Sequence, residues 1–202
     1  KYESDTIRWK NIIKDVKETV PTVKRDKNDA AVLIYSGGTT GKSKGIVLSN
    51  LCFNALATQC YDVCPEARPG ASMLSGLPIF HGFGLCVAIH APLMLGMKCI
   101  LLPKVDVKKL NETIKKTKPT IVPAVPTMLK AITNNKNLGP DSFSSVKVIL
   151  SGGDYLSDDL RARVLDYFRS CGSSTHIRIG YGLSEATAFF TATQYGAEDI
   201  DN

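Results

Sequence analysis

Apolar and polar residues alternate with the periods of short strands and helices from residue 72 onward. Apolar, often β-branched runs predict strands at residues 73–77, 98–102, 120–122, 146–150 and 177–179. Apolar positions at helical spacing predict helices at residues 83–95, 107–118, 126–134 and 157–171. Because repeated strand-helix units form parallel sheets, we expect an α/β fold with a largely parallel sheet flanked by helices.

The first 70 residues follow another pattern. Two apolar runs, residues 32–35 and 46–48, flank a polar loop and predict a hairpin, and residues 51–64 predict a helix that ends before Pro65. An amphipathic pattern before the hairpin predicts a short helix around Trp9, Ile12, Ile13 and Val16. We therefore expect one partial domain, with residues 1–70 as lead-in, hairpin and helix, and residues 71–202 as a strand-helix repeat.

Composition and charge exclude several classes of protein. The chain has 202 residues, 44% of them hydrophobic, which is enough to bury the single core of a soluble protein. Its net charge of +6 is spread out, which argues against a nucleic-acid partner. No leading signal sequence or long uncharged apolar span is visible, so we expect a cytoplasmic protein with no transmembrane segment. The six cysteines lack metal-site spacing and are interpreted as reduced thiols.

The polar loop of the hairpin has the composition of a phosphate cradle. Its glycines leave backbone N–H groups uncovered, and its hydroxyls and lysines add donors and positive charge. The Walker A pattern fits poorly, because its first glycine falls on Ser36 and the loop leads into a second apolar strand instead of a helix. An ordinary hairpin turn is the simpler alternative.

Three later loops follow predicted strands and should meet at one edge of the sheet. They are Leu-Pro-Ile-Phe-His-Gly-Phe-Gly at residues 77–84, Ser-Gly-Gly-Asp at 151–154 and Gly-Tyr-Gly-Leu-Ser-Glu at 180–185. Tyr181 offers a stacking face, and Glu185 a carboxylate of the kind that binds Mg²⁺ together with phosphates. Taken alone, each has a structural alternative, such as a packed core histidine for His81 or simple turn glycines at Gly152 and Gly153.

The run Tyr-Ser-Gly-Gly-Thr-Thr-Gly-Lys-Ser-Lys-Gly at residues 35–45 resembles the phosphate-binding signature of the adenylate-forming (AMP-binding) superfamily. The two later glycine loops resemble its other motifs, and Pro-Ile-Phe-His at residues 78–81 resembles the branch of acyl-CoA and aryl-CoA ligases and luciferases. The resemblance extends over nearly the whole chain. Five positions depart from the common pattern: Gly37, Ser43, Asn50, Asp154 and Ser184.

The resemblance implies a fragment of the large N-terminal domain of an acyl-CoA synthetase of the long-chain fatty-acid CoA ligase branch. Such an enzyme uses ATP, Mg²⁺ and CoA to convert a carboxylic acid, here expected to be a fatty acid, to acyl-adenylate and then acyl-CoA. The expected partners are these small molecules and the remaining N- and C-terminal parts of the same enzyme. Because the C-terminal lid domain is not in this sequence, we expect the chain alone to be inactive as an acid-thiol ligase.

The resemblance also assigns roles to individual residues. Polyphosphate contacts are expected from one loop: Ser36, Gly37, Gly38, Thr39, Thr40, Gly41, Lys42 and Lys44. The remaining nucleotide contacts are expected from two loops: Gly152, Gly153, Asp154, Gly180, Tyr181, Gly182 and Ser184. His81, Phe83 and Gly84 would contact the acid, and Glu185 the metal. Catalytic roles are expected for His81, Lys44, Ser184 and Glu185.

Other functions stay open at this point. A nucleotide-binding module without catalysis and an adenylation domain that loads a carrier protein would both share these motifs, whereas a P-loop phosphotransferase fits the loop register less well. The sequence does not fix the acid, its chain length or the oligomeric state. A peripheral contact with a membrane is also left open.

Overall fold

The computed structural model describes residues 11, 13–15, 22–36, 43–103, 105–134 and 138–193. Its strands are β1 (Ala30–Ser36), β2 (Lys44–Ser49), β3 (Ser72–Ser75), β4 (Lys98–Leu101), β5 (Ile121–Ala124), β6 (Val148–Ser151), β7 (His176–Tyr181) and β8 (Thr191–Ala192). Its helices are α2 (Asn50–Val63), α3 (Ala91–Met94), α4 (Leu110–Thr117), α5 (Pro126–Thr133) and α6 (Asp158–Ser170). Short 3-10 helices are η1 (Ile13–Asp15), η3 (Val107–Lys109) and η4 (Ser184–Ala186), and η2 (Phe83–His90) is a π-helix.

The main sheet confirms the predicted α/β class. Its strand order is β4-β3-β5-β6-β7-β8, and all neighbours pair in parallel except β7 and β8. The chain moves outward from β3 to β4 and then returns to place β5 on the other side of β3. The strand order therefore reverses between β3 and β5, the arrangement at which open α/β sheets bind ligands outside the carboxyl ends of their strands.

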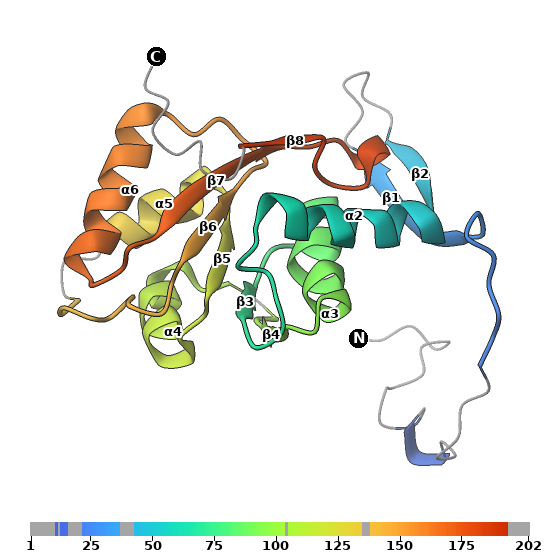
Figure 1. Cartoon of the computed structure of the whole chain (residues 1–202), viewed down its shortest axis with the longest axis horizontal. Helices are drawn as coiled ribbons and strands as arrows, with labels where there is room; N and C mark the ends of the chain where they lie inside the picture. Colours follow the sequence, from blue (N-terminus) through green and yellow to red (C-terminus); the bar gives the residue numbers. More distant parts are fainter. Residues whose placement is uncertain are drawn as a thin grey trace, which may run out of the picture.

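Two layers of helices enclose this sheet (Figure 1). On one face a buried core joins α4, α5 and α6 to the strands, with Leu129, Phe143 and Phe168 at its centre. On the other face α2 and the π-helix pack through Leu56, Cys60, Cys86 and Val87 in a second cluster. The helices cover both faces of the sheet, and the carboxyl ends of its strands form an open edge from which the loops extend.

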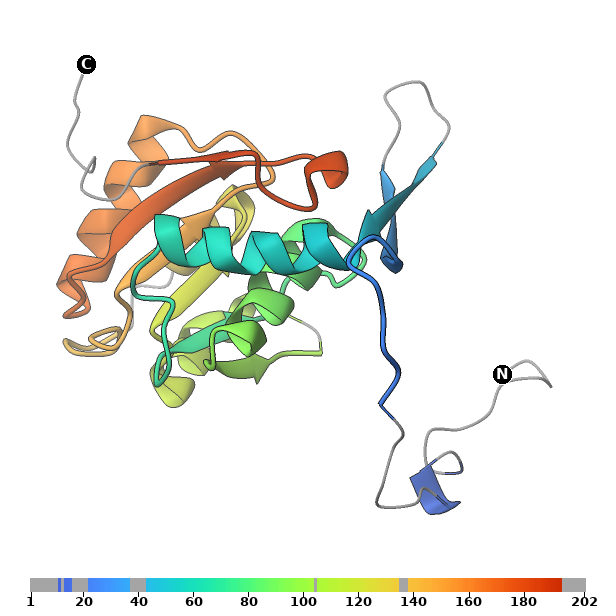
Figure 2. The same cartoon turned by 45° about the vertical axis from the view of Figure 1, so that its right-hand side comes forward.

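The predicted hairpin is confirmed as a separate two-stranded antiparallel sheet, β1 with β2. Alternate residues Ile34 and Leu48 are buried, whereas Leu33 and Val47 are exposed. The hairpin stands at the N-terminal end of α2 (Figure 2). Ser49 caps that helix, because its Oγ accepts a hydrogen bond from the Cys52 N–H at 3.2 Å.

The expected single helix at residues 83–95 is wrong in its geometry. Residues 83–90 form a π-helix, and α3 follows over only four residues. Pro92 lies just beyond the change and has no N–H with which to continue an α-helical ladder to the Ala88 carbonyl. The buried Ser75 hydroxyl on β3 donates to that carbonyl instead.

Other predicted boundaries also shift. The helix expected at residues 107–118 begins as a single 3-10 turn, where the Asp106 carboxylate accepts from the Lys108 N–H at 3.0 Å, and becomes α-helical only at Leu110. The strand expected at residues 120–122 continues to Ala124 through Pro123. Pro123 is tolerated because β5 pairs with β3 only at Ile121, so no ladder bond is lost on that side. Strand β8 was not predicted.

Two of the sequence predictions, the first helix and the division at residue 70, stay predictions. The helix around Trp9 falls mostly outside the described residues, and the division at residue 70 stays a prediction. The second cluster joins both parts, because Ile34 and Leu48 pack with Val87 and Ala188.

All six cysteines are free thiols. Within the described ranges, no helix has both the length and the apolar character needed to cross a membrane.

Candidate active site

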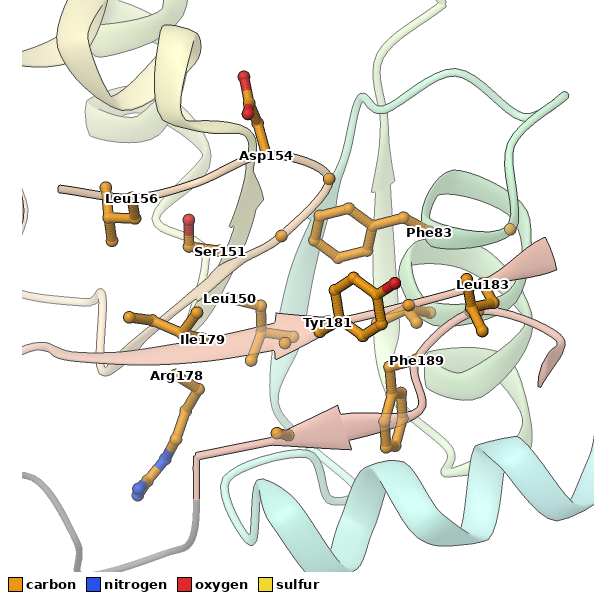
Figure 3. Close-up of a pocket in the computed structure, with 18 of the residues that line it drawn as sticks. Phe83, Leu150, Ser151, Asp154, Leu156, Arg178, Ile179, Tyr181, Leu183 and Phe189 are labelled. Carbon is orange, nitrogen blue, oxygen red and sulfur yellow. The ribbon is translucent and has the colours of Figure 1, made fainter. Parts of the chain in front are cut away.

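A cavity of about 710 Å³ opens at the carboxyl edge of the sheet, as Figure 3 shows. Three loops that the sequence analysis marked contribute to it: the loop after β3, the loop after β6 and the loop after β7. The predicted residues that line the cavity are His81, Phe83, Gly152, Gly153, Asp154, Gly180, Tyr181, Gly182 and Ser184. The structure therefore brings together motifs that are about 100 residues apart in the chain, as expected for loops at one sheet edge.

His81 is held at the start of the π-helix by three hydrogen bonds. Its N–H donates to the Pro78 carbonyl at 3.2 Å, and its carbonyl accepts from the Leu85 N–H at 3.0 Å. The ring Nδ1 accepts from the Phe83 N–H at 3.2 Å. Because Nδ1 is an acceptor, the neutral ring carries its proton on Nε2. His81 thus offers an exposed N–H donor at the cavity and is not a packed core histidine.

Close backbone contacts fix the two loops that face each other. Gly82 and Gly182 lie against the segment at residues 187–188, and an added Cβ would collide with the carbonyl of Thr187 or of Ala188. Gly84 is also buried, with the Pro78 carbonyl where its Cβ would stand. Gly84, predicted as a contact of the acid, does not line the cavity. Its visible role is to let the π-helix approach the preceding loop.

The loop after β6 places a glycine surface beside two aromatic rings. Gly152 is buried, and a Cβ there would stand 3.6 Å from Cε1 of Phe83. Gly153 has φ of +82°, a conformation that favours glycine. Tyr181 is 62% exposed at the end of β7, and both Tyr181 and Phe83 line the cavity (Figure 3). This arrangement can accept a flat ring system, because the backbone at Gly153 and the ring of Tyr181 are both exposed at the cavity.

Asp154 shows a local role for its carboxylate. Its Oδ1 accepts a hydrogen bond from the Tyr155 N–H at 2.8 Å and so shapes the turn toward α6. Beside it, Ser151 is only 2% exposed and lines the cavity, and no hydrogen-bond partner of its Oγ lies among the described residues. A buried hydroxyl without a partner is costly, so a polar group inside the cavity would satisfy it.

The Ser184–Glu185 turn lies between the cavity and the hairpin. It is closed by hydrogen bonds from the Ala186 N–H to the Leu183 carbonyl and from the Thr187 N–H to the Ser184 carbonyl, both 3.1 Å. Turn η4 packs against β1 and β2 (Figure 2). Ser184 lines the cavity, whereas the exposed Glu185 does not.

The mouth of the hairpin is described, but most of its loop is not. Ser36 pairs with Lys44 at the end of the ladder, and the Ser43 hydroxyl donates to the Ser36 carbonyl at 3.0 Å. Neither Ser36 nor Lys44 lines the cavity. The remaining predicted phosphate contacts lie outside the described residues: Gly37, Gly38, Thr39, Thr40, Gly41 and Lys42.

Several residues of the cavity were missed by the sequence analysis. Leu150, Ser151 and Ile179 precede the glycine loops on their strands, so the strand register would have found them. Cys60 and Val63 come from α2, and no motif points to them. Burial, with smaller contributions from Cys64 and Cys86, raises the pKa of the Cys60 thiol to about 12. Cys60 is therefore an uncharged, apolar part of the wall near neutral pH.

The sequence matches the pattern of the AMP-binding enzyme family over residues 2–201. The chain belongs to this family. It is 34% identical over 170 residues to a long-chain-fatty-acid–CoA ligase from Bacillus subtilis, covering 84% of this chain and 29% of the relative. It is 32% identical over 200 residues to 4-coumarate–CoA ligase-like 6 from Arabidopsis thaliana, covering 94% of this chain and 35% of the relative.

A solved structure supports the same fold. The crystal structure of ATP-bound MatB from Rhodopseudomonas palustris superposes with a TM-score of 0.78 at 26% identity, over 91% of this chain and 35% of that one. The chain spans about a third of the length of these relatives.

The close approach at Gly182 gives a testable expectation. Gly182→Ala should lower the free energy of unfolding by about 1 to 3 kcal/mol, because its Cβ collides with the Ala188 carbonyl and the backbone must move. Gly139→Ala is the matched control, since a Cβ there meets no atom within 4 Å. Urea denaturation followed by circular dichroism measures both. Equal stability of the two variants would contradict the proposed contact.

Proposed function

We propose that this chain forms the adenylate-forming site of an acid-thiol ligase that makes acyl-CoA. The observation that carries the proposal is the convergence of the His81, Gly152–Asp154 and Tyr181–Ser184 loops on one cavity, with the hairpin packed against the adjoining turn. A carboxylate oxygen would attack the α-phosphorus of ATP, and the bond to pyrophosphate would break. The CoA sulfur would then attack the carbonyl carbon of the acyl-adenylate and release AMP.

The two ends of the nucleotide have different surroundings in this proposal. Adenine would lie between Tyr181 and the backbone of Gly152 to Asp154, where aromatic and glycine faces are uncovered. Ser184 would donate to the α-phosphate. The hairpin loop, including Thr39, Thr40 and Lys44, would hold the β- and γ-phosphates, a proposal supported by the contacts of strands β1 and β2 with η4. Catalysis would then come mainly from positioning and from stabilising charge on the transferring group.

The acid would enter beside His81 and Phe83. The Nε2–H of His81 can donate to the carboxylate oxygen or, after attack, to the oxygen bonded to phosphorus. Apolar side chains make up much of the cavity wall, among them Val87, Leu150 and Phe189, which favours an apolar acid such as a fatty acid. The relatives include both a fatty-acid ligase and a 4-coumarate ligase-like protein.

A magnesium ion fits the donors that are present. Within the described ranges no three metal-binding side chains form a cluster, but Mg²⁺ in nucleotide sites commonly takes one or two carboxylates, with phosphates and waters completing its shell. Exposed Glu185, on the turn that contacts the hairpin, supplies such a carboxylate. The ion would neutralise phosphate charge. We propose a cytoplasmic location for the enzyme.

Binding to this 202-residue chain tests the function. We expect an acylsulfamoyl adenosine, a stable mimic of acyl-adenylate, to bind more tightly than AMP in isothermal titration calorimetry, because both halves of the cavity are then filled. A site that activates an acid is expected to bind the acyl group as well as the nucleotide, so the acyl group should raise the affinity. Equal affinities for the two ligands would instead indicate a nucleotide-binding module without acid activation.

Lys44 is expected to contact only the polyphosphate. Lys44→Ala should weaken ATP binding on the order of 10- to 100-fold, the loss of a hydrogen bond to a charged group, and leave AMP affinity unchanged. Lys98→Ala removes an exposed lysine from β4 and serves as the control. If both variants bind ATP equally well, Lys44 has no phosphate contact.

Glu185 is expected to act through Mg²⁺. Glu185→Gln keeps the size of the side chain and removes its charge, so the Mg²⁺ concentration needed for half-maximal ATP binding should rise several-fold. Fluorescence titration with an ATP analogue at increasing Mg²⁺ measures this. Glu112→Gln on α4 is the matched exposed control. An unchanged Mg²⁺ requirement would mean that Glu185 only shapes the turn.

A further inference from the structure

The cavity extends to both faces of the sheet. Successive strand residues point to opposite faces, and on β6 Ile149 packs with the α4–α6 core whereas Leu150 packs with the α2 cluster. Leu150 pairs with Arg178 on β7, and Ser151 pairs with Ile179. All four line the cavity. It therefore has two lobes that meet over the glycine loops at the carboxyl edge.

The lobe on the α6 face is the more polar one. It carries the Ser151 hydroxyl, the Asp154 carboxylate and the Asp158 carboxylate at the start of α6. The lobe on the α2 face is bounded by Cys60, Val63, Val87, Leu150 and Phe189. A ligand with a polar nucleoside and an apolar tail matches this division, with the nucleoside on the α6 face and the tail on the α2 face.

The guanidinium of Arg178 interacts electrostatically with Cys64, the residue that follows Val63 at the end of α2. Arg178 is 3% exposed and lines the cavity, but Figure 3 shows its guanidinium pointing away from Leu150, Tyr181 and Phe189. The part nearest these residues is the methylene stem, which is apolar. An extended hydrocarbon therefore meets apolar surface at Leu150, at Phe189 and along the Arg178 stem.

Helix α2 closes the lobe away from the glycine loops. Cys60 and Val63 are three residues apart on this helix and so lie on neighbouring positions of one face. Cys60 is 7% exposed and packs with Cys86 and Val87, which fixes its place, whereas Val63 is half-buried at the last turn. The neighbouring Gln59 and Asp62 are exposed and point elsewhere.

We propose that Cys60 and Val63 form the end wall of the acyl compartment and set the longest acid that this site accepts. The inference rests on the proposed function and adds the residues that determine chain length. A tail that fits gains roughly fourfold in affinity for each buried methylene group, so affinity should rise with length until the tail reaches this wall.

The test uses Val63, because its half-buried position tolerates a larger side chain. Acylsulfamoyl adenosines with hexanoyl, decanoyl and palmitoyl tails are titrated into the chain and into Val63→Phe and Val63→Ala, with AMP as the ligand without a tail. Val63→Phe should weaken the analogue with the longest accepted tail at least about tenfold and leave AMP and hexanoyl binding unchanged. Val63→Ala should shift the preference toward longer tails.

Gln59→Phe adds the same ring to the outer face of α2 and should leave the whole series unchanged. AMP affinity and the thermal unfolding midpoint report whether each variant is folded. If AMP and hexanoyl analogues bind but Val63→Phe and Val63→Ala both keep the original length preference, the end wall lies elsewhere and the proposed function stands. If no tail adds affinity over AMP, both proposals fall.

Discussion

The structure depends on one buried contact in which α2, the π-helix and the turn after η4 meet. Ile34 and Leu48 bring the inner face of the hairpin into this cluster, Val87 brings in the π-helix, and Ala188 brings in the segment after η4. Burying each large aliphatic side chain contributes about 1.5 to 3 kcal/mol, which is enough to hold the small hairpin in place. A two-stranded sheet is only marginally stable by itself, so this contact positions strands β1 and β2 relative to the cavity.

Much of the arrangement follows from patterns within the sequence. The hairpin was predictable because two apolar runs, residues 32–35 and 46–48, flank a polar loop. The meeting of the later loops was predictable because parallel strands all end at one edge. The π-helix could not be predicted. Residues 83–89 are all apolar or glycine and show no helical period, and the helix geometry depends on Pro92 and on the Ser75 hydroxyl from another strand. Cys60 is one of the apolar positions of the predicted helix at residues 51–64, but periodicity does not distinguish a filled core from the wall of a cavity.

Ser43 shows how a departure from a family pattern can be accommodated. The related signature usually has proline here, which stiffens the backbone by fixing φ. In this chain the Ser43 hydroxyl donates to the Ser36 carbonyl across the mouth of the hairpin. A side-chain hydrogen bond thus constrains the two ends of the loop where a ring would otherwise do so.

Strand β4 forms one border of the main sheet and pairs only with β3 within the part of the chain that the structure describes. Leu101 on this strand and Leu93 and Met94 just before it are exposed. A border strand with open backbone groups beside bare hydrocarbon is a template on which another strand can add. A charged side chain on such a border opposes the addition of a second strand, and Leu101→Lys would place that charge on β4.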